Sequence, residues 1–181
     1  MTGESERPPG TLSDGLSRDV SNRLAAAKLW LVSTTSPTTC GDLPYLATAL
    51  YALIPVPTTR VRDMTVDRHW RMYVNPAWIL ATDVPVVAAR MAHVVWHLLA
   101  EHSARSDDLD VHRSTARHWQ AAADATVAEL LTGLDTGLAT PDDLGFPNGR
   151  SAEEYYARLS GLPAASAADP DGRGENGDGE Q

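Results

Sequence analysis

The chain has 181 residues, enough for one domain of ordinary size with a hydrophobic core of its own. Its formal net charge of −9 argues against a general nucleic-acid binder and against binding to an anionic membrane, because both partners would repel an acidic surface. The single cysteine, Cys40, excludes an internal disulfide, and a lone loop thiol fits a reducing compartment.

Both ends of the chain are predicted to be disordered tails. Residues 1–13 and 163–181 are rich in glycine, proline, serine and acidic residues and contain little that could be buried. The first residues also lack the basic start and the apolar run of a secretory signal, so we expect a cytoplasmic protein. The folded domain is expected to occupy residues 14–162.

The domain is predicted to begin with two helices. Apolar residues recur at three- and four-residue spacing over about 14–34, which predicts an amphipathic helix capped by Ser13 or Asp14. The segment 43–56 carries apolar side chains on nearly every face. It predicts a second, mostly buried helix that ends before Pro55.

An alternating pattern follows these helices. In TTRVRDMTVD and HWRMYVNP, β-branched or aromatic residues alternate with charged ones, which is the two-residue period of half-buried strands. The pattern predicts a β-hairpin with its turn near Asp67 and Arg68. After the second strand, the segment PAWIL predicts a single helical turn.

The most apolar segment of the chain spans residues 84–100. It is slightly short for a membrane span and is interrupted by Arg90, His93 and His97. We therefore expect a buried helix, with Pro85 tolerated in its first turn.

The last part of the domain is predicted to be helical. A polar stretch at 103–112 is expected to separate the apolar helix from another, which runs from about 110 or 114 to 134. A short helix follows, with Ser151 and Glu154 in capping-box register and Gly161 at its end. Helices around one short sheet make an α+β domain that is mostly helical, with the hairpin or small sheet preceding the histidine-containing helix.

Two histidines on the apolar helix are the first candidate site. Residues four apart in a helix lie on one face, so His93 and His97 could bind one ion. This is the spacing of the HExxH zinc motif, whose glutamate serves as the general base, but here the motif reads HVVWH and Val94 stands at the glutamate position. An HxxxH pair alone is more often two histidines satisfied by core hydrogen bonds. An unpaired polar group in apolar surroundings costs about 1 to 3 kcal/mol, however, and a shared metal would provide a partner.

Four blocks of the sequence, in this order, resemble a family of putative bacterial metallopeptidase domains that commonly precede a von Willebrand factor A-like domain. In that family a strand ending in Asn-Pro leads to a helix with HExxHxxxxH, and the following helix carries a tryptophan, small residues and an aspartate. The resemblance covers roughly residues 20–160. The blocks are VRDMTVDRHWRMYVNPAWIL, VVAARMAHVVWHLLAEHSAR, RHWQAAADATVAEL and SAEEYYARL.

The resemblance implies a zincin-like fold and a set of metal ligands. His93 and His97 match the two metal-binding histidines, and Asp124 matches the aspartate, the implied third ligand. Three such ligands would leave Zn²⁺ its usual open position for water. The alternative for Asp124 is a buried hydrogen-bonding residue. His102 matches the later histidine, but it lies five residues beyond His97, about 500° around the helix. It is expected to point away from the pair, either on the surface or where it supports a ligand without binding the metal.

The sequence departs from the family pattern at two polar positions. Val94 replaces the glutamate, and the asparagine that usually follows the aspartate is matched by Val127 or is absent. General acid–base assistance typically contributes about 10²- to 10⁴-fold, so ordinary peptidase turnover is not expected. Glu101 lies about 12 Å along the helix from His93, too far without a bend. Glu129 is the possible substitute base.

The expected function is a zinc-metallopeptidase-like domain that is impaired or inactive as a peptidase and acts as a binding or scaffold module. One alternative is an active metal-dependent hydrolase with a substitute base, and another is a metal-free helical adaptor. The resemblance implies a von Willebrand factor A-like protein and an AAA-type ATPase as partners. Trp96 and Trp119 are assigned to packing.

Overall fold

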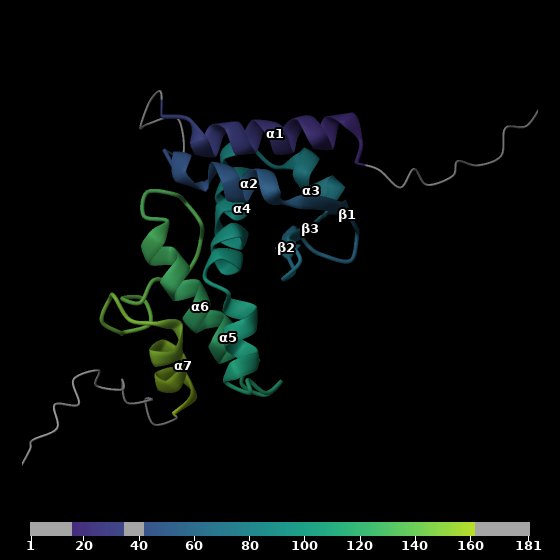
Figure 1. Cartoon of the computed structure of the whole chain (residues 1–181). Helices are drawn as coiled ribbons and strands as arrows, with labels where there is room; N and C mark the ends of the chain where they lie inside the picture. Colours follow the sequence, from purple (N-terminus) through teal and green to yellow (C-terminus); the bar gives the residue numbers. More distant parts are fainter. Residues whose placement is uncertain (1–15, 35–41, 162–181) are drawn as a thin grey trace, which may run out of the picture.

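The computed structural model describes residues 16–34 and 42–161 (Figure 1). The predicted tails at 1–13 and 163–181, and Cys40, lie outside the described residues. The elements in chain order are α1 (Arg18–Val32), the 3₁₀ helix η1 (Pro44–Leu46), α2 (Ala47–Ala52), β1 (Ile54–Pro57), β2 (Met64–Val66), β3 (Arg71–Val74), α3 (Pro76–Ala81), α4 (Val84–Leu99), α5 (His102–Asp108), α6 (Ala116–Leu130) and α7 (Ala152–Ser160).

The first helix forms as predicted but starts later. Ser17 is the N-cap of α1, and its side chain accepts a hydrogen bond from the Val20 amide at 3.3 Å. The prediction of Ser13 or Asp14 as the cap was wrong, because the helix begins only after Leu16. Its buried face, repeating every three or four residues, packs mainly against α4.

The predicted second helix is shorter, and a strand takes its last residues. The helical part ends at Ala52, and β1 pairs in parallel with β3, with Ile54 opposite Arg71. The strand order is β1-β3-β2, so β1 is an edge strand. Sequence reasoning missed β1 because it contains Pro55 and Pro57, and proline is confined to strand edges where its missing N–H is tolerated.

The predicted hairpin is confirmed. β2 pairs with β3 in antiparallel register, with Thr65 opposite Tyr73. Asp67 makes the turn where it was predicted: its carbonyl oxygen accepts from the Trp70 amide at 3.0 Å, and its carboxylate accepts from the His69 amide at 2.9 Å. The hairpin therefore holds β2 at the second edge of the sheet, next to α4.

Asn75 explains the Asn-Pro pair after β3. Its side-chain oxygen caps α3 by accepting from the Ala77 amide at 3.1 Å. Its side-chain nitrogen donates to the carbonyl of Val61 at 3.0 Å, and its own amide donates to the carbonyl of Asp63 at 2.8 Å. One residue thus starts a helix and fixes the loop that leads into β2.

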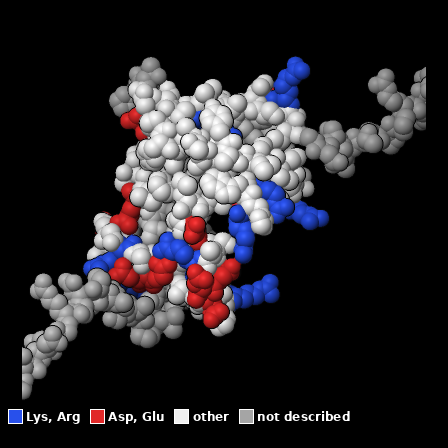
Figure 2. Space-filling model, in the orientation of Figure 1, with Lys and Arg blue, Asp and Glu red and all other residues white. Residues whose placement is uncertain are grey.

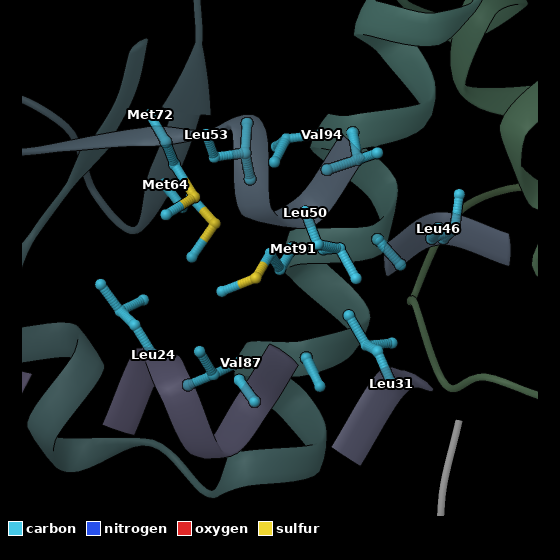
Figure 3. Close-up of a cluster of buried hydrophobic side chains, with 14 of the residues drawn as sticks. Leu24, Leu31, Leu46, Leu50, Leu53, Met64, Met72, Val87, Met91 and Val94 are labelled. Atoms are coloured by element: carbon cyan, nitrogen blue, oxygen red, sulfur yellow. The ribbon is translucent and has the colours of Figure 1, made fainter. Parts of the chain in front are cut away.

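The main core forms between α1, α2, the sheet and α4 (Figure 3). Leu24 and Leu31 of α1 face Val87 and Met91 of α4, and Met72 reaches in from the sheet. The long apolar helix is thus buried as predicted, with Pro85 in its first turn. None of the helices in the described part of the chain is long and apolar enough to cross a membrane.

The C-terminal helices form a second, smaller cluster around Trp119 and Tyr155. The capping box of α7 is confirmed, with Ser151 and Glu154 exchanging side-chain to backbone hydrogen bonds. The predicted polar stretch at 103–112 is wrong in part, since most of it forms α5. Figure 2 shows that the face over α1 and α2 is largely uncharged, whereas acidic side chains gather on the half that holds α5 to α7. The observed fold is α+β and mostly helical, with a small mixed sheet before α4, as predicted.

Candidate metal centre

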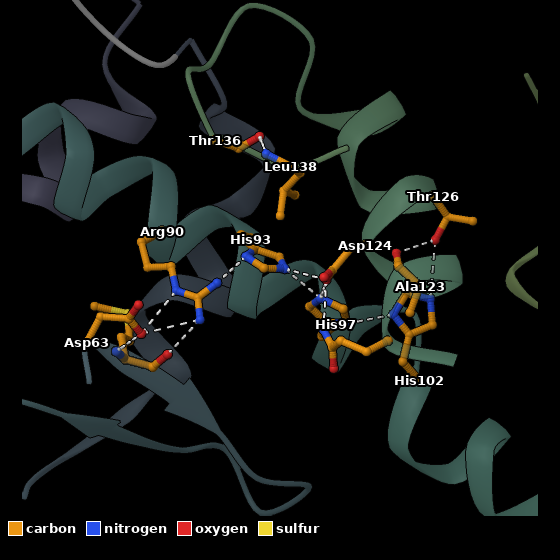
Figure 4. Close-up of polar contacts among 12 residues, drawn as sticks. Asp63, Arg90, His93, His97, His102, Ala123, Asp124, Thr126, Thr136 and Leu138 are labelled. Atoms are coloured by element: carbon orange, nitrogen blue, oxygen red, sulfur yellow. Dashed lines mark hydrogen bonds and ion pairs between the residues drawn. The ribbon is translucent and has the colours of Figure 1, made fainter. Parts of the chain in front are cut away.

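The candidate site lies between α4 and α6 (Figure 4). His93 and His97 stand one turn apart on α4, and Asp124 faces them from α6. The Nε2 atoms of the two histidines are 2.7 Å apart, and each is 3.0 Å from Oδ1 of Asp124. The structure therefore brings together the three residues that the resemblance implied as metal ligands.

The spacing of these atoms fits a metal ion. Ligands about 2.0 to 2.1 Å from a tetrahedral Zn²⁺ are separated from one another by about 3.3 Å. The observed separations of 2.7 and 3.0 Å come close to this value without any rearrangement of the helices. Two imidazoles and a carboxylate are also ligand types that zinc accepts. We conclude that the donor set and its spacing both suit the group that the family implies.

The charges of the side chains at the site suit a cation as well. Burial lowers the pKa of His93, whose side chain is only 5% exposed, so the ring is neutral. Burial pushes the pKa of the Asp124 carboxyl upward, but the hydrogen bond from His93 and the adjacent His97 ring outweigh it, and the net pKa lies below the usual range. Asp124 is therefore ionised. Neutral imidazole and ionised carboxylate are the forms that bind metals.

Sequence reasoning missed two residues that touch the site. Gln120 donates from its side-chain nitrogen to Oδ1 of Asp124 at 2.8 Å, and Nη1 of Arg90 lies 2.5 Å from Nδ1 of His93. Gln120 precedes Asp124 by four residues and Arg90 precedes His93 by three. Residues at these spacings share a helix face, so the signal was present in the sequence.

The prediction that His102 points away from the pair was wrong, but the expectation that it could support a ligand without being one agrees with its contact to His97. α4 ends at Leu99, and Glu101 adopts a left-handed conformation with φ of 52°, so the chain turns before α5 begins. The turn returns the His102 ring to the site: its Nδ1 is 2.9 Å from Nδ1 of His97, and the residue is 4% exposed. Burial lowers the pKa of His102 to about 4, so this ring is neutral too.

The hydrogen bonds of the site fix where the ring protons lie. A guanidinium only donates, so Nδ1 of His93 accepts from Arg90 and the neutral ring carries its proton on Nε2. At a separation of 2.7 Å the Nε2 atom of His97 must then be unprotonated. His97 therefore donates from Nδ1 to His102.

The contact between His102 and Thr126 agrees with this assignment of the ring protons. With Nδ1 accepting from His97, His102 carries its proton on Nε2, which lies 3.5 Å from the hydroxyl oxygen of Thr126. That hydroxyl donates to the carbonyl of Ala123 at 2.8 Å, so its oxygen is available to accept. The two histidines of α4 thus hold opposite tautomers: His97 turns a lone pair toward Asp124, whereas His93 turns a proton.

A pocket of about 620 Å³ opens beside the histidines, between the edge strand β2 and the helices α4, α5 and α6. Val94 is part of its wall and is 4% exposed. The side chain at the glutamate position of the motif therefore faces the pocket but has no titratable group. The other lining residues are Thr65, Val66, Asp67, Arg68, Arg90, His93, His97, Leu98, His102, Ser103, Ser106, Trp119, Gln120 and Ala123.

The other carboxylates near the site are engaged elsewhere. Among the residues lining the pocket in the described part of the chain, the only acid is Asp67. Hydrogen bonds from Arg71, His69 and Tyr73 outweigh desolvation and lower the pKa of Asp67 to about 2. The Glu129 carboxylate accepts from the Gly149 amide at 2.7 Å and the Tyr155 hydroxyl at 3.4 Å. Glu101 is exposed at the turn between α4 and α5.

Val127 and the two tryptophans assigned to packing lie partly in the core and partly beside the pocket. Val127 is fully buried in the main core, so the family's asparagine has no polar counterpart there. Trp96 is partly buried, with its ring 6.3 Å from that of Tyr45. Trp119 is 7% exposed and packs in the second cluster, and its ring also meets the edge of His102 at 6.1 Å. Packing is thus part of the role of Trp119. Its ring also helps to enclose His93, His97 and His102, which we call the histidine row.

Comparison with known proteins gives one match. The chain matches the model of a protein family described as a putative metallopeptidase domain, over residues 21–181. No curated protein and no solved structure shows a significant match. The matched stretch includes both α4 and α6, the helices that carry His93, His97 and Asp124.

Proposed function

The chain belongs to the putative metallopeptidase domain family, and we propose that it is a member that binds metal and a partner but does not turn over peptides. The observation that carries the proposal is Val94, an apolar residue in the pocket wall between two histidines that are arranged as metal ligands. The ligand set is retained while the general base is absent. Such a site supports binding better than hydrolysis.

Zinc is the metal that the proposal names. His93, His97 and Asp124 would hold the ion, which would supply Lewis-acid polarisation of a ligand oxygen. The spacing of the three ligand atoms and the ionised state of Asp124 support this choice. A site built by residues from two helices would also tie α4 to α6, so metal binding would contribute to folding stability.

The rival function is an active hydrolase with a substitute base. A general base must come within about 2.6 to 3.2 Å of the proton that it takes. Glu129 bonds to Gly149 and Tyr155 instead of facing the pocket, and the low pKa of Asp67 makes it a weak base. Neither carboxylate supports the rival. The metal-free adaptor is disfavoured by the contact of His97 with Asp124, because an unprotonated Nε2 lies 3.0 Å from an ionised carboxylate oxygen with no proton between them.

The scaffold role is proposed to serve a von Willebrand factor A-like protein or an AAA-type ATPase, on the resemblance alone. Co-expression of the chain with each candidate, followed by size-exclusion chromatography, tests this part. Co-elution that survives in a His97→Ala variant would assign the contact to the scaffold and not to the metal. Separate elution of every candidate would reject the partner classes.

Peptide cleavage tests the loss of turnover. The zinc-loaded wild-type protein and a Val94→Glu variant are incubated with a peptide library, with and without a chelator. We expect no cleavage by the wild type and chelator-sensitive cleavage by the variant, because the substitution would return a carboxylate to the pocket wall. Chelator-sensitive cleavage by the wild type that is abolished in His93→Ala would overturn the proposal. Absence of bound zinc from both proteins would reject its metal half.

A further inference from the structure

Arg90 contacts the histidine that lies nearer the sheet. Its Nη1 atom is 2.5 Å from Nδ1 of His93, and its Nη2 atom donates to the carbonyl of Met64 on β2 at 3.1 Å (Figure 4). A guanidinium has donors only and remains charged in proteins. Nδ1 of His93 is therefore the acceptor, and the ring proton lies on Nε2, the nitrogen that faces His97 and Asp124.

This arrangement opposes metal ligation by His93. A ligating nitrogen needs its lone pair, and a metal-binding histidine usually donates its other N–H to a carboxylate, a carbonyl or water. His97 meets this requirement because its Nδ1 donates to His102. His93 does not, since a proton moved to Nδ1 would meet the N–H of Arg90. Arg90 has to leave Nδ1 before Nε2 can become a ligand.

We propose that Arg90 is a positioning residue that sets the metal affinity of the site, keeping it low while the guanidinium occupies Nδ1 of His93. The proposal rests on the proposed metal-binding function. When Arg90 withdraws, the His93 proton moves to Nδ1 and all three ligand atoms present lone pairs to one point. The affinity of the site is thus governed by a residue that is not itself a ligand.

Arg90 already has a second, more distant partner in Asp63. Oδ1 of Asp63 lies 3.3 Å from Nη2 and 3.4 Å from Nε of Arg90, longer than the usual 2.7 to 3.2 Å. Asp63 is anchored through its carbonyl oxygen, which accepts from the Asn75 amide. The Arg90 side chain is 31% exposed and lines the pocket, so it has room to move. Closer pairing with Asp63 would hold the guanidinium once it leaves His93.

The first test measures zinc affinity by competition with a chromophoric chelator. Arg90→Met removes the donor to Nδ1, and we expect the dissociation constant to fall about 10-fold or more, the size of effect that outer-shell partners have on metal sites. Arg68→Met is the matched control. Arg68 lines the same pocket with the same charge, but it pairs with Asp107 at 3.0 Å, so we expect a change of less than about twofold.

Two outcomes of this test would overturn the proposal. One is an Arg90→Met affinity that is equal to or weaker than the wild type. The other is an equal gain in Arg68→Met, which would assign the effect to charge alone. Asp63→Asn removes the ion pair between Arg90 and residue 63 but leaves the donor to His93, so zinc affinity is expected to stay at or below the wild-type value. A gain in Asp63→Asn would show that the ion pair with Asp63, and not the contact with Nδ1, sets the affinity.

The second test reads the tautomer of His93 directly, in protein kept metal-free by a chelator. Nitrogen-15 NMR of the imidazole rings is expected to show a proton on Nε2 of His93 in the wild type and a shift toward Nδ1 in Arg90→Met. A wild-type ring protonated on Nδ1 would overturn the proposal. This measurement needs no metal, so it separates zinc binding by the site from the role of Arg90. Failure of every variant to bind zinc would reject the proposed function. The tautomer of His93 would still decide whether Arg90 controls the ring proton.

Discussion

The two ends of the histidine row have opposite surroundings. At the α6 end, His97 donates to His102, whose other nitrogen faces the hydroxyl of Thr126. At the sheet end, His93 accepts from the guanidinium of Arg90. Two residues that look equivalent in the HVVWH motif are therefore prepared differently, one with a lone pair toward the site and one with a proton. The readiness of a histidine to bind metal thus depends on the neighbour of its second ring nitrogen.

The point that both ends share is Asp124, so changing it should have the largest effect. Asp124→Asn keeps the shape of the side chain but removes the charge that faces both Nε2 atoms. We expect zinc affinity to fall by more than about 100-fold, beyond the range of outer-shell changes. Metal content after dialysis measures this. One equivalent of zinc retained by a folded Asp124→Asn protein would contradict the site.

The α6 end of the row is broken by His102→Phe, which removes the acceptor for Nδ1 of His97 and keeps a ring in the cavity. We expect zinc affinity to fall by about 10- to 100-fold. The same competition assay as for Arg90→Met then gives changes of opposite sign for the two ends. Trp119→Phe, which alters the packing against His102 but not this hydrogen bond, is the control. An unchanged zinc affinity in His102→Phe would contradict the claim that the two ends of the row act in opposite directions.

The low pKa of His102 predicts a pH dependence of stability in the metal-free protein. The folded-state pKa is about 4, below the ordinary histidine value of 6.5, so the unfolded chain binds a proton more readily. This contribution to stability is complete above about pH 6.5 and is lost as the pH falls toward 4. Urea unfolding at several pH values measures the slope, which should be shallower in His102→Phe. An identical slope would contradict a buried neutral His102.

The smallest effect is expected from the ion pair that joins α5 to α7. Arg105 donates to both carboxylate oxygens of Glu153, at 2.6 and 2.5 Å, and both side chains are about one third exposed. Glu153→Gln should lower the free energy of unfolding by about 1 kcal/mol or less. Zinc affinity should stay within about twofold. A larger loss of zinc affinity would mean that the docking of α5, and not the hydrogen bond of His102, prepares His97.

The sequence predicts the fold well where one pattern dominates. The apolar run of α4, the hairpin turn at Asp67 and the capping box of α7 all follow from local spacing. β1 does not, because its prolines argue against a strand and only the pairing with β3 accounts for it. The end of α4 at Leu99 was hidden too, since the change of direction depends on one left-handed residue, Glu101, in a polar context that a helix also tolerates.

The candidate site, too, could be predicted from the sequence only in part. The ligand candidates His93, His97 and Asp124 could be named from the resemblance, and one-turn spacing on α4 and α6 was enough to indicate Arg90 and Gln120. The approach of His102 depends on the helix break and could not be read from a continuous helix. The tautomers require the partner of every ring nitrogen, which only the three-dimensional arrangement supplies.

The claim that these residues form a metal site is tested most directly by X-ray absorption at the zinc edge, on protein loaded with one equivalent of zinc. We expect a four-coordinate ion with two imidazole ligands and oxygen ligands at about 2.0 to 2.2 Å. We also expect His97→Ala to reduce the number of imidazole ligands by one. A spectrum with no imidazole ligand, or one that His97→Ala leaves unchanged, would contradict the claim.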